Sequence, residues 1–295
     1  MKPCYVVALD GSPASELALE FACPMAVAAG ADLVLAHVIE DSPPGKVHGQ
    51  PHLPSSASAV TSYLEGVAAR CTPVARTCYV PAGGRGLPAS LAAVCAAENA
   101  SLLFLSPHGP ETGVNRWLLG SVAQRTAPVA PCPVFIARGA PDLENGKFRG
   151  VFIADDFTPE HETGWRRILA FGRLHAARVE IVGVIDPANV LPTNLSARFL
   201  PSACRELVEA ARRMAPGHMA VHLSEIETLG IPVVASVLEG DRLDVMAAAL
   251  SRRGAWPLIL RTHGLRGLAA RFAGSFAQSL LQTTSNPVLL VPIPE

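Results

Sequence analysis

The chain carries one series of sequence landmarks twice, in the same order, and this duplication limits its fold more than any other feature. Residues 6–10 form a short apolar segment that ends in an acid, and residues 151–155 repeat that pattern. A second apolar segment, residues 33–39, is matched by residues 179–185. Such self-similarity is the signature of a repeated structural unit. The sequence therefore predicts two copies of one domain.

Three further landmarks occur in each half. A strand-like segment leads to a glycine, a His-Gly pair precedes a Gly-Ser pair, and a proline-led apolar segment closes the half. These landmarks are Gly83, His108-Gly109, Gly120-Ser121 and residues 132–136 in the first half, and Gly240, His263-Gly264, Gly274-Ser275 and residues 286–291 in the second. Coincidence is a poor explanation for five landmarks in one order.

The apolar segments are short and alternate with helical patterns, most clearly at residues 89–98 and 244–253. Ser12 or Ser15 can cap an earlier helix, which Pro24 is expected to kink or interrupt. Apolar strands that alternate with helices indicate a parallel sheet covered on both faces. Each half is therefore predicted to be a doubly wound, Rossmann-like α/β domain of about five strands.

Turn-forming residues separate the two halves. Residues 139–147 are rich in Gly, Pro and Asn and predict a linker. The predicted domains are therefore residues 1–140 and 147–295. Two proline-marked stretches, residues 42–58 and 187–201, predict long connections after the second strand of each half.

Composition limits the classes of partner. The chain has 295 residues, of which 17% are charged, and its formal net charge is −1. A nearly neutral chain lacks the positive electrostatic potential that would attract nucleic acid or an anionic membrane. Its apolar runs stop short of the ~20 residues that span a bilayer, and no secretory signal pattern opens the sequence. We therefore expect a soluble cytoplasmic protein with no nucleic-acid or membrane partner.

The seven cysteines are scattered and form no C-x-x-C pair: Cys4, Cys23, Cys71, Cys78, Cys95, Cys132 and Cys204. Most lie in apolar stretches, which predicts buried, reduced thiols of the kind found in a reducing cytoplasm. His218 and His222 have the spacing of a metal pair but lack a third ligand. No metal site is predicted.

Ligands bind beyond the carboxyl ends of the strands in doubly wound sheets. The residues expected on this rim are Asp10, Val38, Gly109, Asp155, Val184 and Gly264. A glycine at a strand exit lets the backbone approach a ligand closely, and a Gly-Ser at a helix start offers N–H groups to an anion. Together they predict a phosphate cradle. The alternative for the two acids is that each caps the following helix.

The order of these features resembles the universal stress protein family. The shared pattern is strand–Asp, helix, strand–Val, then Gly-x-x-Gly, a nine-residue spacer, Gly-Ser and a closing Pro-Val-x-x-Val, and it covers nearly the whole chain twice. The resemblance implies a Rossmann-like, adenine-nucleotide α-hydrolase-like fold and dimer-like pairing of domains. In the ATP-binding branch of the family it also implies ATP or AMP, with or without Mg²⁺, held by the glycine motif.

The implied nucleotide-binding residues fall in both halves. By position, Asp10 and Val38, or Asp155 and Val184, would contact adenine and ribose, and the glycine motif would face ribose and phosphates. The motif residues and their neighbours are Gly109, Gly120, Ser121 and Val122 in the first half, and Arg261, His263, Gly264, Gly274, Ser275 and Phe276 in the second.

Both halves depart from the family pattern. Arg261 and Ser106 stand at the first glycine position of the motif, and the first-half spacer is one residue longer, with Pro110 at its start. The turn that reads Asp10-Gly11-Ser12 in the first half becomes Asp155-Asp156-Phe157 in the second. Because the second half keeps the spacer, the sequence favours it as the nucleotide site, with Arg261 swinging outward or pairing with phosphate.

Three functions stay open at this point: a nucleotide-binding regulatory protein of the stress response, a nucleotide-free interaction module, and a slow ATPase. The sequence contains no nucleophile elbow and no Gly-x-x-x-x-Gly-Lys loop, so no catalytic residue is predicted. The halves are expected to pair through their apolar closing strands. The resemblance also allows a homodimer of the whole chain.

Overall fold

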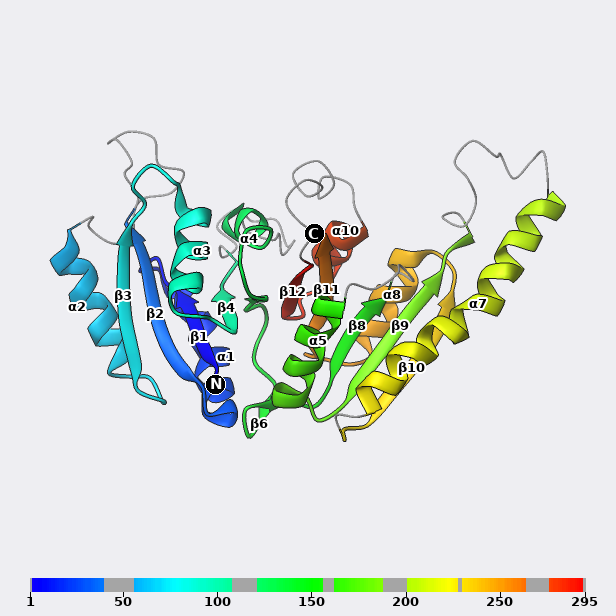
Figure 1. The fold of residues 1–295 in the computed structure, drawn as a ribbon, viewed down its shortest axis with the longest axis horizontal. Coiled ribbons are helices and arrows are strands. Elements are labelled where there is room, and N and C mark those ends of the chain that lie inside the picture. The colour runs from blue at the N-terminus through cyan, green and yellow to red at the C-terminus, as the bar shows by residue number, and fades with distance from the viewer. Residues whose placement is uncertain are drawn as a thin grey trace.

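The computed structural model describes residues 2–39, 56–107, 121–155, 162–187, 201–227, 230–263 and 276–293. The first half supplies β1 (Cys4–Ala8), β2 (Asp32–Ile39), β3 (Ala75–Pro81), β4 (Leu102–Leu105) and β5 (Val134–Ile136). The second supplies β8 (Val151–Asp155), β9 (Val179–Ile185), β10 (Val233–Glu239), β11 (Leu258–His263) and β12 (Val288–Ile293). These strands form one sheet in the order β10-β9-β8-β11-β12-β5-β4-β1-β2-β3 (Figure 1).

Each half repeats one strand order. Its first strand lies in the middle, the second and third strands extend to one side, and the fourth and fifth extend to the other. The strand pairs within each half are parallel. Parallel neighbours need crossover connections, which helices supply. The prediction of two doubly wound α/β units is confirmed.

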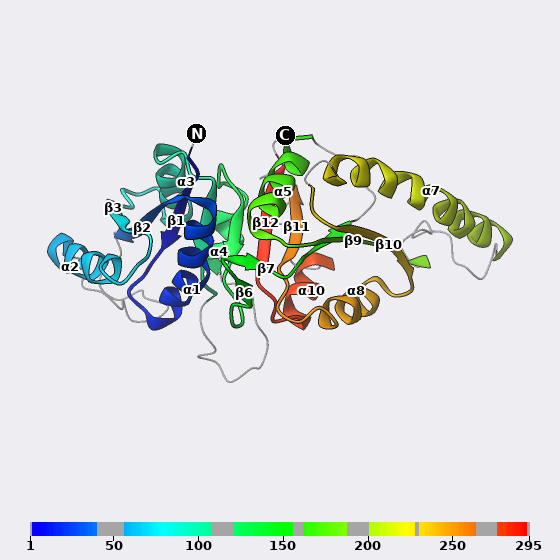
Figure 2. The ribbon, with the colours of Figure 1, turned by 90° about the horizontal axis from the view of Figure 1, so that it is seen from below.

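Helices cover both sides of the sheet (Figure 2). One buried core takes side chains from α1 (Pro13–Ala29), α2 (Ala57–Ala68) and α5 (Glu162–His175). The opposite core takes them from α3 (Leu87–Ala97), α4 (Ser121–Thr126), α8 (Arg242–Ser251) and α10 (Phe276–Thr283). The long helix α7 (Pro201–Glu227) packs beside β10 and β9. Within the described part of the chain, no helix has the length and apolar character needed to span a bilayer.

Of the kink or interruption that the sequence predicts at Pro24, the interruption is wrong, because α1 continues through this residue. The helix runs unbroken between its N-cap Ser12 and Gly30, whose φ of 60° ends it. A proline inside a helix removes one hydrogen bond. The apolar side of α1, which includes the fully buried Phe21 and Met25, is nevertheless held against the sheet. Packing of this kind supplies most of the stability of a helix in a protein.

Helices α3 and α8 each begin two residues before their predicted starts. Pro88 occupies the first turn of α3. Asp241 caps α8, with its Oδ1 accepting the backbone N–H groups of Leu243 and Asp244 at 3.0 Å each. First-turn prolines and capping acids set helix starts, whereas the apolar pattern marks only the buried turns.

The link between the halves is a short hairpin, β6 (Leu143–Glu144) and β7 (Lys147–Phe148). Asn145 and Gly146 form its turn with φ values of 53° and 73°, as a two-residue hairpin of this kind requires. A side chain at Gly146 would overlap the carbonyl oxygen of Pro24. The hairpin therefore packs closely on α1. The domain boundaries at residues 140 and 147 stay a prediction.

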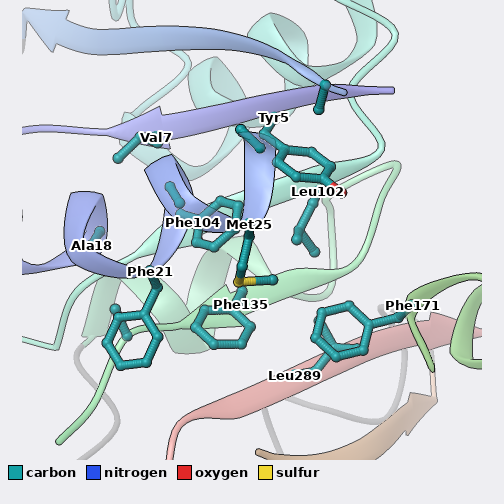
Figure 3. Packing of buried hydrophobic residues seen from close by; sticks show 14 of the residues in the cluster. Tyr5, Val7, Ala18, Phe21, Met25, Leu102, Phe104, Phe135, Phe171 and Leu289 are labelled. Atoms are coloured by element: carbon teal, nitrogen blue, oxygen red, sulfur yellow. The ribbon is translucent and has the colours of Figure 1, made fainter. Parts of the chain in front are cut away.

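β5 and β12 lie side by side and run antiparallel. Phe135 is opposite Leu289, and the flanking pairs are Val134 with Leu290 and Ile136 with Val288. Phe135 and Leu289 occupy the same position after the proline of each closing strand, so this register has local two-fold symmetry. Figure 3 shows Phe135 among side chains of both halves. Its ring centroid lies 6.2 Å from that of Phe171 on α5.

Candidate functional site

The glycine motifs lie outside the described residues. This applies to Gly109 and Gly120 in the first half and to Gly264, Gly274 and Ser275 in the second. The other predicted site residues follow or belong to the strands, or begin α4 and α10. The described part of the site is therefore the rim formed by the strand ends and these two helix starts.

Asp10 follows β1 and shapes the turn into α1. Its Oδ1 accepts the backbone N–H of Ser12 at 2.8 Å and the Ser12 hydroxyl at 2.6 Å. Gly11 has a φ of 88°, a conformation that favours glycine. Ser12 then caps the helix, because its Oγ accepts the N–H of Ser15 at 3.0 Å. Ser12 rather than Asp10 is the helix cap, while Asp10 fixes the turn in front of it.

Val38 lies next to this turn on β2. The parallel register pairs Ala8 with Ala36, and the Leu9 N–H donates to the Ala36 carbonyl oxygen at 2.9 Å, so Asp10 and Val38 both come just after the last paired residues of these adjacent strands. Val38 is buried and pairs on its other side with Val80 of β3. The fold thus brings the predicted first-half residues Asp10 and Val38 together at the carboxyl edge of the sheet.

The strand register aligns β1 with β8 one residue differently from the sequence comparison of the two halves. Val6 of β1 pairs with Leu103 of β4. In the same place of the second half, Phe152 of β8 pairs with Leu258 of β11. Leu103 and Leu258 are themselves equivalent, since each pairs with the first residue of its closing strand. Val6 therefore corresponds to Phe152, one residue later than the sequence comparison places it.

With this register, Asp155 corresponds to Leu9. The equivalence of Asp155 with Asp10 is therefore wrong, and the counterpart of Asp10 is Asp156, which lies outside the described residues. Two consecutive acids made either alignment acceptable in the sequence. Only the pairing with the neighbouring strands separates them.

Asp155 is instead one partner of a buried ion pair. Its Oδ1 lies 3.0 Å from a terminal nitrogen of Arg261 on β11, and the two side chains are 0% and 7% exposed. The guanidinium carbon of Arg261 also lies 5.9 Å from the ring centroid of Trp165 on α5. Arg261 thus points into the protein, toward the α5 side of the sheet. The sequence expectation that Arg261 swings outward is therefore wrong.

The first half has no ion pair at the corresponding place. Leu9 is buried in the core there, and Ser106, the counterpart of Arg261, is 3.4 Å from the carbonyl oxygen of Ser15 on α1. The first half thus has an apolar residue, Leu9, and a hydroxyl residue, Ser106, at these two positions. The other fills them with Asp155 and Arg261.

The remaining predicted residues are spread along the second-half rim and the two helix starts. Val184 is buried on β9 and pairs with Leu238. Phe276 begins α10, where the guanidinium carbon of Arg242 lies 4.1 Å from the centroid of its ring. The others are His263, which ends β11, and Ser121 and Val122, which begin α4.

A cavity of about 470 Å³ lies beside this rim in the first half. Val80, Pro81 and Gly83 line it at the end of β3, and Ser90 and Val94 of α3 form its other wall. Val80 is the strand partner of Val38, so the cavity adjoins the predicted site. Its volume is within the range of small-molecule sites. In the sequence, Gly83 is only a landmark of the repeat, because the residue types around it do not reveal a cavity.

No group of three or more His, Cys, Asp or Glu side chains is placed to hold a metal ion among the described residues. The side chains of His218 and His222 lie outside that part of the chain. The prediction of a metal-free protein therefore stays a prediction.

Comparison with known proteins identifies the repeated unit. The model of the universal stress protein family matches residues 5–138 and again residues 147–292. The chain belongs to the universal stress protein family. Both halves are family members, so the tandem arrangement expected from the sequence is confirmed. No curated protein matches the sequence.

Solved structures with the same two-domain extent share the fold. A universal stress protein from Archaeoglobus fulgidus DSM 4304 superposes with a TM-score of 0.62 at 16% identity, covering 99% of this chain and 97% of that one. A putative universal stress protein from Pseudomonas aeruginosa UCBPP-PA14 gives a TM-score of 0.60 at 15% identity, covering 99% and 93%. At such low identity the likeness concerns the fold alone.

Proposed function

We propose that the chain is a regulatory, adenine-nucleotide-binding protein of the stress response, with its nucleotide site in the first half. One observation carries this proposal: the turn of Asp10 and the strand position of Val38 meet at the carboxyl edge of the sheet. That edge is where doubly wound sheets bind ligands. Asp10 is a partly exposed residue, and carboxylates commonly accept hydrogen bonds from ribose hydroxyls in such folds.

The first half is preferred because of what Arg261 does in the second. The sequence favoured the second half partly because Arg261 could serve a phosphate. Its guanidinium is instead buried beside Asp155, and releasing it would leave a buried carboxylate without that partner, which costs several kcal/mol. The second half also has Phe157 at the place of Gly11, whose φ of 88° suits glycine. These two differences outweigh one extra residue in the first-half spacer.

We also propose that the two halves pair as the subunits of a dimer would. The antiparallel register of β5 and β12 supports this pairing. Two arginines cross between the halves as well. Arg138, which follows β5, donates to the carbonyl oxygens of Leu281 and Thr284 near the end of α10. Arg167 of α5 donates to the carbonyl oxygen of Pro131 at 2.9 Å.

The experiment is to identify the small molecules that the purified protein releases on denaturation. We expect AMP or ATP, recovered by mass spectrometry after purification without added nucleotide. Gly120→Asp places a carboxylate in the first-half motif and should remove the nucleotide, while the matched change Gly274→Asp in the second half should leave it. If the intact protein releases no nucleotide and binds none when it is added, the chain is the nucleotide-free interaction module instead. Phosphate release that Gly120→Asp abolishes would identify a slow ATPase.

A further inference from the structure

The cavity of about 470 Å³ in the first half lies between α3 and β3, the last strand at its end of the sheet (Figure 1). Asp10 and Val38, which carry the proposed nucleotide site, are not among the residues that line it. Its walls are formed by β3, by the connection from β3 to α3 and by α3 itself. The cavity therefore adjoins the proposed nucleotide site without belonging to it.

The middle of the cavity is apolar and elongated. Val80 of β3 lines it together with Val94 and Ala97 of α3. The lining residues of α3 extend from Ser90 to Glu98, a distance of about 12 Å along the helix axis. Ala97 is exposed, so the cavity is open to solvent along α3. It therefore suits a narrow apolar chain that enters from the surface.

The two ends of the cavity differ in charge. Glu98, which follows α3, is bonded to Arg76, whose terminal nitrogen lies 2.7 Å from its Oε2. Arg85, which precedes α3, is exposed and takes part in none of the ion pairs between described residues. Cys78 is half-buried, where the sequence predicted a buried thiol, and burial raises the pKa of that thiol, so it adds no charge at neutral pH. The lining therefore carries one uncompensated charge, which is positive and lies at the Arg85 end.

The connection that carries Arg85 is longer than its counterpart in the second half. Ala82 and Gly240 are equivalent, because each donates its backbone N–H to the last residue of the neighbouring strand. Four residues, 83–86, then lead to α3, whereas Asp241 alone leads to α8. The first half thus has three more residues here, and Arg85 is one of them.

Side chains at the equivalent positions are also smaller in the first half. The positions are matched by the strand pairs and by the helix starts, and they have Val80, Ser90 and Ala97 in the first half and Leu238, Val245 and Arg252 in the second. Val245 packs so closely that its Cγ2 would lie 2.9 Å from a Cβ on Gly240. The small residues and the longer connection together explain why α3 leaves space beside β3.

We propose that this cavity binds an unbranched aliphatic carboxylate of medium chain length, such as octanoate. The carboxylate pairs with Arg85, and the alkyl chain lies along Val80, Val94 and Ala97. Removal of the methylene groups from water stabilises the complex, and a guanidinium binds a carboxylate through two parallel hydrogen bonds. The carboxylate of Glu98 at the far end disfavours the reverse orientation, in which two like charges would meet.

The first test is calorimetric titration of the full-length protein with octanoate, octanol and acetate. Octanoate should bind saturably at one site per chain. Octanol has the chain without the charge and should bind about tenfold more weakly. Acetate has the charge without the chain and should show no measurable binding.

Two variants separate the charge from the apolar walls. Arg85→Gln should weaken octanoate about tenfold and leave octanol unchanged. Ala97→Leu fills the cavity and should weaken both ligands about tenfold. Both positions are exposed, so the fold should tolerate the changes, which circular dichroism checks. Arg149→Gln is the matched control, because Arg149 is exposed and does not line the cavity.

Labelling of Cys78 with N-ethylmaleimide locates the ligand. Octanoate should slow the labelling of Cys78, which lines the cavity, and leave that of the half-buried Cys71 unchanged. Equal binding of octanoate to the wild type and Arg85→Gln would overturn the proposal, as would unprotected Cys78. Displacement of octanoate by AMP would also overturn it, because the cavity would then belong to the nucleotide site. A protein that binds octanoate in this way but no nucleotide would support this proposal and contradict only the function proposed above.

Discussion

The hydroxyl of Tyr5 lies 2.6 Å from Nε2 of His175, and this buried hydrogen bond joins β1 of the first half to α5 of the second. Both residues are 1% exposed. Burial lowers the pKa of His175 to about 4, so the imidazole is neutral in the folded protein at physiological pH. An unfolded histidine titrates near ~6.5. The junction of the two halves therefore contains a histidine that must be protonated on unfolding in mildly acidic solution.

The protein should lose stability as the pH falls from about 6.5 toward 4. Between those values the unfolded chain binds the proton and the folded one does not, so the free energy of unfolding declines, by about 3 kcal/mol in total. Urea titrations at several pH values measure this. In His175→Gln the part of the decline due to this group should vanish, while Tyr5→Phe should keep it, because the histidine stays buried. A decline that is identical in all three proteins would rule out His175 as its source.

The pair of Asp155 and Arg261 should show strong energetic coupling. Asp155→Leu or Arg261→Ser alone leaves a buried charge without this partner and should cost about 3–5 kcal/mol. The double variant installs the residues that the first half has at these positions, Leu9 and Ser106. It should recover to within about 1–2 kcal/mol of the wild type. Chemical denaturation of the four proteins completes the cycle, and simple additivity would show that the two side chains do not depend on one another.

Arg138 should be a main source of stability between the halves. Arg138→Met keeps an apolar side chain but removes the donors to the carbonyl oxygens of Leu281 and Thr284, so we expect a loss of about 2–4 kcal/mol. Arg149 forms an exposed ion pair with Asp142 at 3.7 Å, and Arg149→Met is the matched control, with an effect below about 1 kcal/mol. Thermal melts distinguish the two variants. Equal melting temperatures for Arg138→Met and the wild type would contradict this role.

The sequence predicted the repeated α/β units because short apolar strands and turn glycines recur in a fixed order. It misplaced Asp155 because residue patterns do not set strand register: adjacent acids at 155 and 156 fit equally well until β11 aligns β8. The ion pair of Asp155 with Arg261 joins residues that only the fold makes neighbours.

Local chemistry explains the other differences. The sequence predicted a kink or an interruption at Pro24 because proline disrupts isolated helices, yet α1 continues through Pro24 with its apolar side buried. The positive φ values of Asn145 and Gly146 could be foreseen from the dipeptide. The close contact of Gly146 with α1 could not, because it depends on how the hairpin packs. The sequence pattern thus predicts the positions of turns more readily than the elements against which the turns pack.

Calorimetric titration with ATP and AMP tests the nucleotide proposal most directly. We expect one nucleotide site per chain, because Arg261 in the second half forms a buried ion pair with Asp155. Asp10→Ala should weaken binding at least tenfold, while the matched change Asp156→Ala in the second half should leave it unchanged, provided that circular dichroism shows both variants folded. Two equal sites per chain, or binding that survives Asp10→Ala and is lost in Asp156→Ala, would contradict a site in the first half.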